Sequence, residues 1–293
     1  RFDDALLAFS RVIDVDPDFA EAYFNKGVVL ENLGRYEEAV PAFEGFFRLI
    51  PDRSDAWYHH GRCLEFLGRD EDAAKSYEKA RLKDPLNVGI LLSEGKTLNR
   101  LDQYEDAIRI LDIALGIEPD YGELLFEKGF ALARLDRHEE AEAVLGNADT
   151  LLPERFEPAF FRGLSLMHLG RYADAVSAFD TALSLNEDNA EIWYNKGLSH
   201  SRLRQYEKSI ESCDQAIRIN PGYYEALFEK GLALFELARY QDSVHELDSA
   251  LTIDDTRRDC HYARGRALLA LDRLEDALLA FSRVIEIDPD FAE

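Results

Sequence analysis

The chain has 293 residues, of which 58 are acidic and 34 are basic, so its formal net charge is −24. This excess of acid argues against a nucleic-acid partner and against attraction to an anionic membrane surface, since both need clustered Lys and Arg. Hydrophobic residues make up 46% of the sequence, which excludes an acidic disordered tail and allows a large buried core.

The composition also bears on where the protein works. No apolar run approaches the roughly 18 residues of a membrane span, and the first residues lack the pattern of a signal peptide. Three cysteines are too few for a disulfide framework, and no Asn-x-Ser/Thr glycosylation site occurs. We therefore expect a cytoplasmic protein without a membrane segment.

A glycine recurs every 34 residues along the chain, at Gly27, Gly61, Gly95, Gly129, Gly163, Gly197, Gly231 and Gly265. Counted from seven residues before each glycine, eight repeats start at residues 20, 54, 88, 122, 156, 190, 224 and 258. In all eight repeats position 8 is then Gly, position 14 is Leu and position 20 is Ala or Ser, and position 32 is Pro in six of them. Such a period predicts a repeat architecture.

Each repeat is predicted to form two helices. Positions 4, 8 and 11 recur at helical spacing, and the small residues at positions 8 and 20 let two helices approach closely. A turn is expected near positions 15–16, and Pro at position 32 ends the second helix. In chain order, we expect residues 1–19 to be the second helix and turn of a truncated repeat, residues 20–291 to be eight helical hairpins, and residues 292–293 to begin a further repeat.

Small residues at positions 8 and 20, an aromatic residue or Leu at 24, Ala near 27 and Pro at 32 resemble the tetratricopeptide repeat, and the resemblance covers the whole chain. It implies an all-α fold, a right-handed superhelical solenoid of helix-turn-helix repeats, whose first helices line a concave groove. Members of the family bind a peptide or a partner protein in that groove, and the resemblance implies no cofactor and no catalytic residue.

One position departs from the family pattern. Position 7, usually Leu in the family, is charged or His in every repeat: Lys26, His60, Glu94, Lys128, Arg162, Lys196, Lys230 and Arg264. Long basic side chains can still cover apolar surface with their stems while the charge reaches water, so the expected fold stands.

The two ends of the sequence are almost the same. Residues 1–21 match residues 273–293 at 17 of 21 positions, an offset of eight repeats. We interpret this as the trace of an eight-repeat block duplicated in a longer parent protein, from which this chain is a fragment. The helix at 1–16 is expected to expose Leu6, Phe9 and Ile13, which would permit end-to-end self-association.

Candidate chemistry in the sequence is weak. Gly95-Lys96-Thr97 resembles the end of a phosphate-binding loop, but the required first glycine is absent and the segment falls inside a predicted helix. His59 and Cys63 are four residues apart, which supplies only two of the ligands that a zinc site needs. Cys213 and His200 fall at interior positions. We therefore expect a non-catalytic protein with no metal site.

The acids concentrate at positions 2, 18 and 19, in the first turns of the predicted helices. Negative charge there complements the exposed N–H groups and the helix dipole, which is sufficient to explain them. A functional alternative is that the acids at position 2 border the groove, repel acidic partners and attract basic ones.

The groove is expected to be the working surface. Position 5, which faces away from the packed positions, is apolar or aromatic in all eight repeats: Phe24, Tyr58, Leu92, Phe126, Phe160, Tyr194, Phe228 and Tyr262. An exposed row of this kind would be a peptide-binding platform, because Tyr and Phe supply contact area at low entropic cost. The alternative is that neighbouring side chains cover the row.

Charge varies along this groove. The second to fourth repeats carry a basic sector, Arg62, Lys96, Arg100 and Arg134 with Asn99 beside them, and later repeats carry an apolar sector, Leu164, Leu198, Leu232 and Phe235. We hypothesise that a partner segment places an acidic group against the basic sector and apolar side chains against the other. Alternatively, the basic residues pair with the acids at position 2.

Two places are irregular. Pro41 falls inside a second helix, where it should bend the helix or cost roughly 3 kcal/mol, and Gly45 and Phe46 follow it. In residues 142–158, acids stand at normally apolar positions and a Gly-Asn pair interrupts the helix, so we predict a weak junction and a candidate hinge there. The predicted function is a protein-interaction scaffold; the alternatives are a self-assembling structural array and the targeting arm of a larger enzyme.

Overall fold

The computed structural model describes residues 2–291, and over this range all regular structure is helical, with 17 α-helices, one short 3₁₀ helix and no β-strand. The predicted start of a further repeat at 292–293 lies outside the described residues. The elements are α1 (Phe2–Val15), α2 (Ala20–Asn32), α3 (Tyr36–Leu49), α4 (Ser54–Phe66), α5 (Asp70–Lys83), α6 (Val88–Arg100), α7 (Tyr104–Ile117), α8 (Gly122–Arg134), α9 (His138–Leu151), α10 (Glu157–His168), α11 (Tyr172–Leu185), α12 (Ala190–Arg202), α13 (Tyr206–Ile219), α14 (Tyr224–Glu236), α15 (Tyr240–Ile253), α16 (Arg258–Ala270), α17 (Leu274–Ile287) and η1 (Pro289–Phe291).

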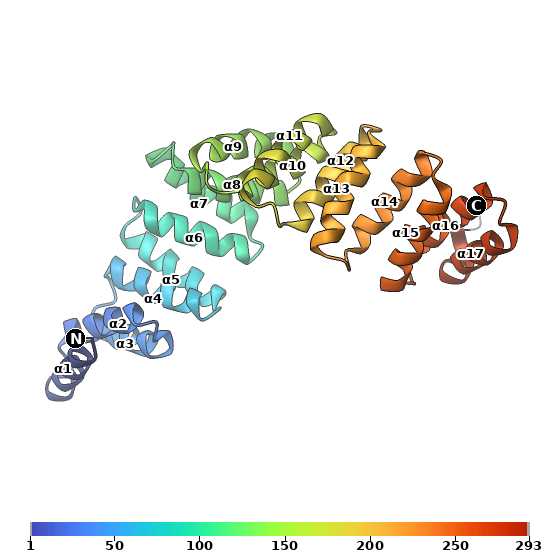
Figure 1. The fold of residues 1–293 in the computed structure, drawn as a ribbon. Coiled ribbons are helices and arrows are strands. Elements are labelled where there is room, and N and C mark those ends of the chain that lie inside the picture. Colours follow the sequence, from blue (N-terminus) through green and yellow to red (C-terminus); the bar gives the residue numbers. More distant parts are fainter. Residues whose placement is uncertain (1, 292–293) are drawn as a thin grey trace. The chain divides into compact units, whose positions relative to one another are not determined.

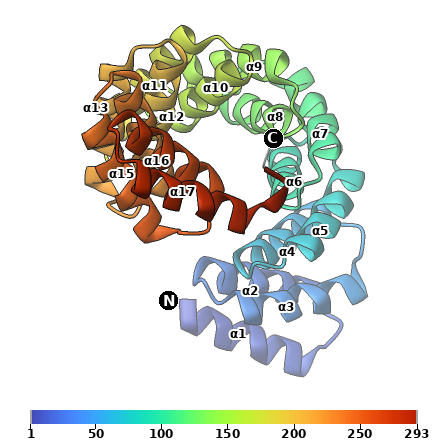
Figure 2. The same ribbon diagram turned by 90° about the vertical axis from the view of Figure 1, so that its right-hand side faces the viewer.

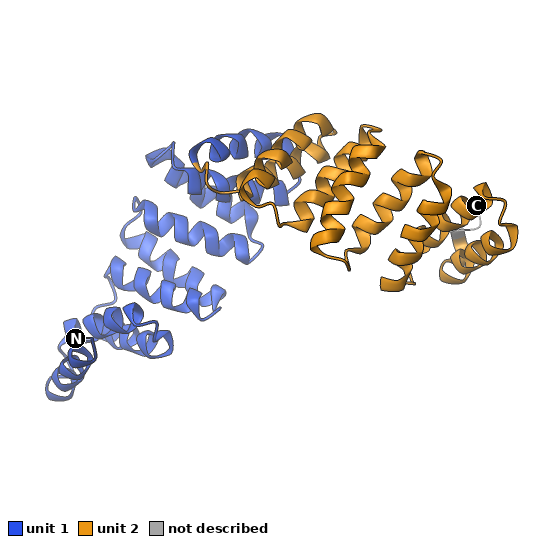
Figure 3. Ribbon diagram, viewed as in Figure 1, with its two compact units in different colours: residues 1–151 blue, residues 152–293 orange. Residues whose placement is uncertain are grey.

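The chain divides into two compact units, one up to Leu151 and one from Leu152, coloured separately in Figure 3. In unit 1, α1 precedes the hairpins α2–α3, α4–α5, α6–α7 and α8–α9, and each hairpin packs on the next in chain order (Figure 1). Unit 2 stacks the hairpins α10–α11, α12–α13, α14–α15 and α16–α17 in the same way (Figure 2). The expected all-α solenoid of helical hairpins is confirmed.

The hairpin turn has the same geometry in every repeat. The backbone N–H at position 16 donates to the carbonyl at position 11, as in Arg35 to Leu30 at 2.9 Å, which closes a Schellman motif at the end of each first helix. The residue at position 15 is left-handed throughout, with φ near 70° at Gly34, Gly68 and Gly170 and φ of 57–58° at the five non-glycine positions, Asp102, Asp136, Arg204, Ala238 and Asp272. The turn therefore keeps its shape without glycine.

The glycine at position 8 makes room for the large side chain at position 24 of the same hairpin. A Cβ added to Gly27 would lie 2.8 Å from the Phe43 ring, and one added to Gly163 would lie 2.5 Å from the Phe179 ring. The small residues at positions 20 and 27 are buried around this contact, so the core of each hairpin forms where the two helices come closest.

The charged residues at position 7 have partners in the preceding repeat. Lys128, Lys196 and Lys230 lie 2.6–2.7 Å from the carboxylates of Asp112, Asp180 and Asp214, and Arg264 pairs with Asp248 in the same way. All four acids stand at position 25. The side chain of Lys196 is only 18% exposed although that of Asp180 is 55% exposed, so the stem is covered while the ion pair reaches the surface.

The prediction for α1 was wrong at Leu6. This side chain is buried in a cluster with Leu30, because α2 packs over the face that the sequence left without a partner. Phe9 and Ile13 are half-buried, and the exposed apolar side chains of α1 include Leu7 and Val15 instead.

The irregular sequence of the first repeat has a packing explanation. α3 continues through Pro41, which is exposed, and Gly45 accommodates the ring of Tyr23, since a Cβ on this glycine would lie 2.5 Å from the ring. Phe46 is fully buried beneath Phe24. The second irregular place, residues 142–158, contains the boundary between the two compact units. The hinge itself stays a prediction.

Replacing Ala238 by Gly is expected to stabilise the protein by about 0.5 kcal/mol, because glycine relieves the cost of a left-handed backbone while loosening the unfolded chain only slightly. Gly68→Ala is the matched control. Its added Cβ meets nothing within 4 Å, so the expected loss of about 1 kcal/mol comes from the backbone alone. Urea denaturation of both variants measures the difference, and equal stabilities would contradict the explanation.

Candidate functional site

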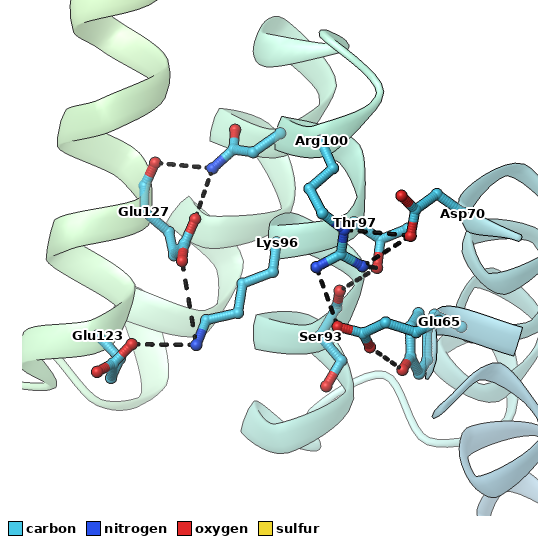
Figure 4. Close-up of polar contacts among 10 residues, drawn as sticks. Glu65, Asp70, Ser93, Lys96, Thr97, Arg100, Glu123 and Glu127 are labelled. Carbon is cyan, nitrogen blue, oxygen red and sulfur yellow. Dashed lines mark hydrogen bonds and ion pairs between the residues drawn. The ribbon is translucent and has the colours of Figure 1, made fainter. Parts of the chain in front are cut away.

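The predicted basic sector lies on the first helices of unit 1. Arg62 is on α4, Lys96, Asn99 and Arg100 are on α6, and Arg134 is on α8. We call the side of these helices that carries the five residues the first-helix face. Its central part is shown in Figure 4.

Arg62 is engaged by a buried acid of the preceding repeat. Its Nη1 lies 3.1 Å from Oε1 of Glu31 on α2, and Nδ1 of His59 lies 2.7 Å from Oε2 of the same carboxylate. Glu31 is buried, and a buried carboxylate is costly without cationic or hydrogen-bonding partners. Arg62 therefore compensates a charge inside the protein.

Lys96 and Asn99 bind α8. Lys96 Nζ lies 3.0 Å from Oε2 of Glu123 and 4.0 Å from Oε1 of Glu127 (Figure 4). Asn99 Nδ2 donates to the carboxylate of Glu127 at 2.9 Å and to its backbone carbonyl at 3.0 Å. Since Glu123 is an acid at position 2, the alternative that basic side chains pair with these acids holds for Lys96.

Arg100 faces the other way, toward α4 and α5. Its guanidinium lies 3.0 Å from Glu65 and 3.0 Å from Asp70, and Nη2 donates to Oγ1 of Thr97 at 3.1 Å (Figure 4). Glu65 also accepts a hydrogen bond of 2.7 Å from the hydroxyl of Tyr77, whose pKa is raised by burial and by this carboxylate. Arg100 thus links three elements of unit 1.

Arg134 differs from the other three basic residues. It is exposed, and its guanidinium carbon lies 5.5 Å from the ring centroid of Tyr104. Among residues 2–291 it forms no ion pair with a carboxylate. The charge of the basic sector is therefore compensated internally at three positions and is available to a partner at Arg134.

The row at position 5 is not an exposed platform. Phe126 and Phe160 are buried, and Phe24, Tyr58, Leu92, Tyr194 and Phe228 are half-buried. Neighbouring side chains cover the rings; the guanidinium of Arg53, for example, lies 3.9 Å from the ring centroid of Phe24. Tyr262, at 41% exposure, is the one member of the row with a large accessible surface. The expectation of an exposed row was wrong, and the alternative of a covered row holds.

The apolar sector lies in unit 2 and is partly accessible. Leu164, Leu198, Leu232 and Phe235 are all half-buried on α10, α12 and α14. Arg266 on α16 places its guanidinium 4.5 Å from the ring centroid of Phe235, so this sector also contains a cation. An apolar partner side chain would find area here, although less than the sequence alone suggests.

A buried acid stands on the same helices of unit 2. Glu229 on α14 is buried, and burial raises the pKa of its carboxyl, opposed by a hydrogen bond from Ser201 and by the charge of Arg202. The nearby Tyr194 and Tyr223 have ring centroids 5.3 Å apart, and burial raises the pKa of Tyr194 to about 12. This cluster holds negative charge away from water and makes Glu229 a titratable group of unit 2.

The rejected chemistry can be located in the structure. Gly95-Lys96-Thr97 lies in the middle of α6, where a Cβ on Gly95 would meet Leu111, so no loop surrounds a phosphate. Cys63, Cys213 and Cys260 are free and buried, and burial raises the pKa of Cys63 to about 12. Within residues 2–291 no three His, Cys, Asp or Glu side chains are grouped to hold a metal ion. No helix in the same range is long and apolar enough to span a bilayer.

Sequence reasoning missed the acids that bind the basic sector. Glu31 and Glu65 both stand at position 12, and their partners stand at positions 9 and 13 of the next repeat, 31 and 35 residues further on. The same offset in two adjacent repeats could have revealed these pairs. It also missed Arg266, which continues position 9 into the last repeat.

Glu229→Gln is expected to stabilise the protein at pH 7.5 by about 1 kcal/mol, because it removes a charge that burial disfavours. The carboxyl with its raised pKa binds a proton more tightly in the folded state, so the penalty appears as the pH rises through the unfolded and then the folded pKa. Below pH ~4.5 both states are protonated and the two proteins should be equally stable. Urea denaturation against pH tests this.

Glu236→Gln, at an exposed position of the same helix, is the control and should change stability at neither pH. An equal gain in both variants would show that reducing net charge, and not burial, is responsible.

Comparisons with known proteins agree with this geometry. A family model described as "Tetratricopeptide repeat" matches residues 1–46, 33–87, 92–149, 162–224, 197–258 and 228–290. The comparison with curated proteins gave no match.

Among solved structures, YrrB, titled "a TPR protein with an unusual peptide-binding site", has 24% identity and a TM-score of 0.56 over 64% of this chain and 96% of its own. A tetratricopeptide repeat protein from Parabacteroides merdae has 19% identity and a TM-score of 0.59 over 80% of this chain and 93% of its own. MamA from Desulfovibrio magneticus has 22% identity and a TM-score of 0.55 over 59% and 97%. At these identities the likeness shows the fold.

Proposed function

Since the chain belongs to the tetratricopeptide repeat family, we propose that it is a non-catalytic protein-interaction scaffold whose first-helix face binds a segment of a partner protein. The observation that carries this proposal is the uncompensated charge of Arg134 on a face where Arg62, Lys96 and Arg100 are held by acids. A guanidinium stacked on a ring and open to solvent is ready to bind a carboxylate with two parallel hydrogen bonds.

The partner chemistry follows from the neighbouring residues. An acidic side chain or a chain terminus would lie against Arg134, and an aromatic or aliphatic side chain of the same partner would find Phe66, which is 60% exposed on α4 and stacked on Tyr36. The acids that fix the other basic residues also limit which partners bind, because a second acidic group would meet Glu123 or Glu65. In unit 2, the half-buried apolar sector offers further contact area.

The family name YrrB carries in its title, a protein with a peptide-binding site, supports the same class of function for this chain without identifying its ligand. A cytoplasmic location is part of the proposal. It is supported by three free cysteines, all buried, and by a composition without glycosylation sites.

End-to-end self-association is the second candidate, and a specific surface favours it. Leu274, Leu278 and Leu279 on α17 are each more than half exposed, whereas Leu6, the counterpart of Leu278 in the nearly identical α1, is buried under α2. A helix packed on α17 as α2 packs on α1 would bury this surface.

Arg134→Glu is expected to remove the main partner in an affinity capture from a lysate of the source cell, because the substitution replaces the accessible guanidinium by a like charge for an acidic ligand. Arg48→Glu, on the second helix α3, is the matched control and should retain the same proteins. The affinity of the purified partner for Arg134→Glu should fall about tenfold or more.

Equal retention by both variants would place the binding site elsewhere. Recovery of this chain alone, with a mass that rises with concentration, would favour self-association over the scaffold.

A further inference from the structure

A cavity of about 740 Å³ opens between the second helices α5 and α7 of unit 1, with α6 as its floor. Leu98 and Leu101 form the floor, and Ile110 and Ile113 form one wall, with Ile113 45% exposed. None of these residues belongs to the first-helix face. The volume is in the range of sites that bind small ligands or single side chains.

Unit 2 contains a counterpart. A cavity of about 690 Å³ lies between α11 and α13 over α12, and its lining includes Asp180 and Lys196. These two residues stand at positions 25 and 7, and their charged atoms are 2.6 Å apart. In this cavity a lysine of the protein therefore neutralises the acid at position 25.

The same two positions of the unit 1 cavity both carry acids. Position 25 is Glu78 and position 7 is Glu94. Glu94 is buried and accepts a hydrogen bond of 2.7 Å from Nε of Arg81, so its partner comes from position 28. Burial raises the pKa of Glu94, Arg81 opposes this rise, and the charge of Glu78 adds to it.

The remaining charges leave the cavity negative. Arg109 pairs with Asp106, and Lys75 lies 3.3 Å from Asp72, so both cations at the rim have partners. Glu71 and Glu78 line the cavity and form no ion pair or hydrogen bond with any of the residues that the structure describes. The cavity thus combines an apolar floor with two uncompensated carboxylates.

We infer that the α5–α7 cavity binds a Lys or Arg side chain of a partner protein, with the aliphatic stem on Leu98 and Ile113 and the charged end at Glu78. The inserted side chain takes the place that Lys128, Lys196, Lys230 and Arg264 occupy at other junctions of this chain. Four internal pairs of the same kind show that a basic side chain fits between a first helix and the acid at position 25.

The charge of the whole protein favours this occupant. At a net charge of −24 the protein attracts basic partners over a distance, and the two carboxylates at the cavity then select a cation at close range. This surface lies on the second helices, so its occupation does not depend on the function proposed for the first-helix face.

The test uses the full chain with labelled Ile and Val methyl groups and the peptide acetyl-Leu-Lys-Leu-amide. NMR titration should shift the methyl signals of Ile110 and Ile113 saturably, while Val176 in the unit 2 cavity stays unchanged. The same peptide with norleucine in place of Lys keeps the stem and removes the charge, and it should bind about fivefold more weakly.

Two variants separate binding from folding. Glu78→Gln should weaken binding of the lysine peptide about fivefold, and Glu94→Lys should abolish it, because the new side chain can pair with Glu78 as Lys196 pairs with Asp180. Thermal melting and the methyl spectrum confirm that both variants are folded.

The inference is overturned if the norleucine peptide binds as tightly as the lysine peptide, or if Glu78→Gln leaves the affinity unchanged. It is also overturned if the lysine peptide causes no saturable shift at Ile110 and Ile113 up to about 10 mM, a concentration that detects even millimolar affinity.

Discussion

The salt bridge between position 7 of one repeat and position 25 of the repeat before it is the contact on which the stacking of hairpins depends most visibly. The family usually places Leu at position 7, whereas this chain places Lys or Arg there and covers the stem between helices. Lys230 shows how far this arrangement extends, since its ammonium lies 2.7 Å from Asp214 and 2.8 Å from Glu246. Hydrogen bonds to these two carboxylates raise the pKa of Lys230 against the effect of burial.

Most of the other charge is used in the same internal way. Arg residues at position 16 pair with acids at position 19 in the first turn of second helices, as in Arg35 with Glu38 at 2.7 Å. Acids at positions 6 and 12 hold the basic side chains of the first-helix face. The residues left without such partners, Arg134 on one side of unit 1 and Glu78 on the other, are therefore the ones to which we assign external partners.

The fold could be predicted from the sequence because its determinants are local and repeat eight times. Glycine at position 8 and proline at position 32 specify close helix packing and helix ends, and neither depends on distant residues. The turn could be placed but not its backbone, since Asp102 and Ala238 adopt the left-handed conformation that the sequence marks only where Gly is present.

The candidate site was predicted less well. Helical spacing indicates which side chains point away from the core, but the coverage of Phe24 by Arg53 and the burial of Leu6 under α2 depend on how successive hairpins approach each other. Electrostatic pairing is equally non-local, because Arg100 finds its acids 30 and 35 residues earlier in the chain. These contacts follow from stacking geometry, which no single repeat encodes.

The most direct test of this account is a double-mutant cycle on Lys196 and Asp180, with Lys196→Met and Asp180→Asn, measured by urea denaturation. The exposed pair Arg171 and Asp174 in the same unit provides the reference. If the junction contact stabilises stacking, its coupling free energy should be about 1 kcal/mol, against about 0.3 kcal/mol for the reference pair. A coupling at the junction no larger than that of the exposed pair would contradict the account.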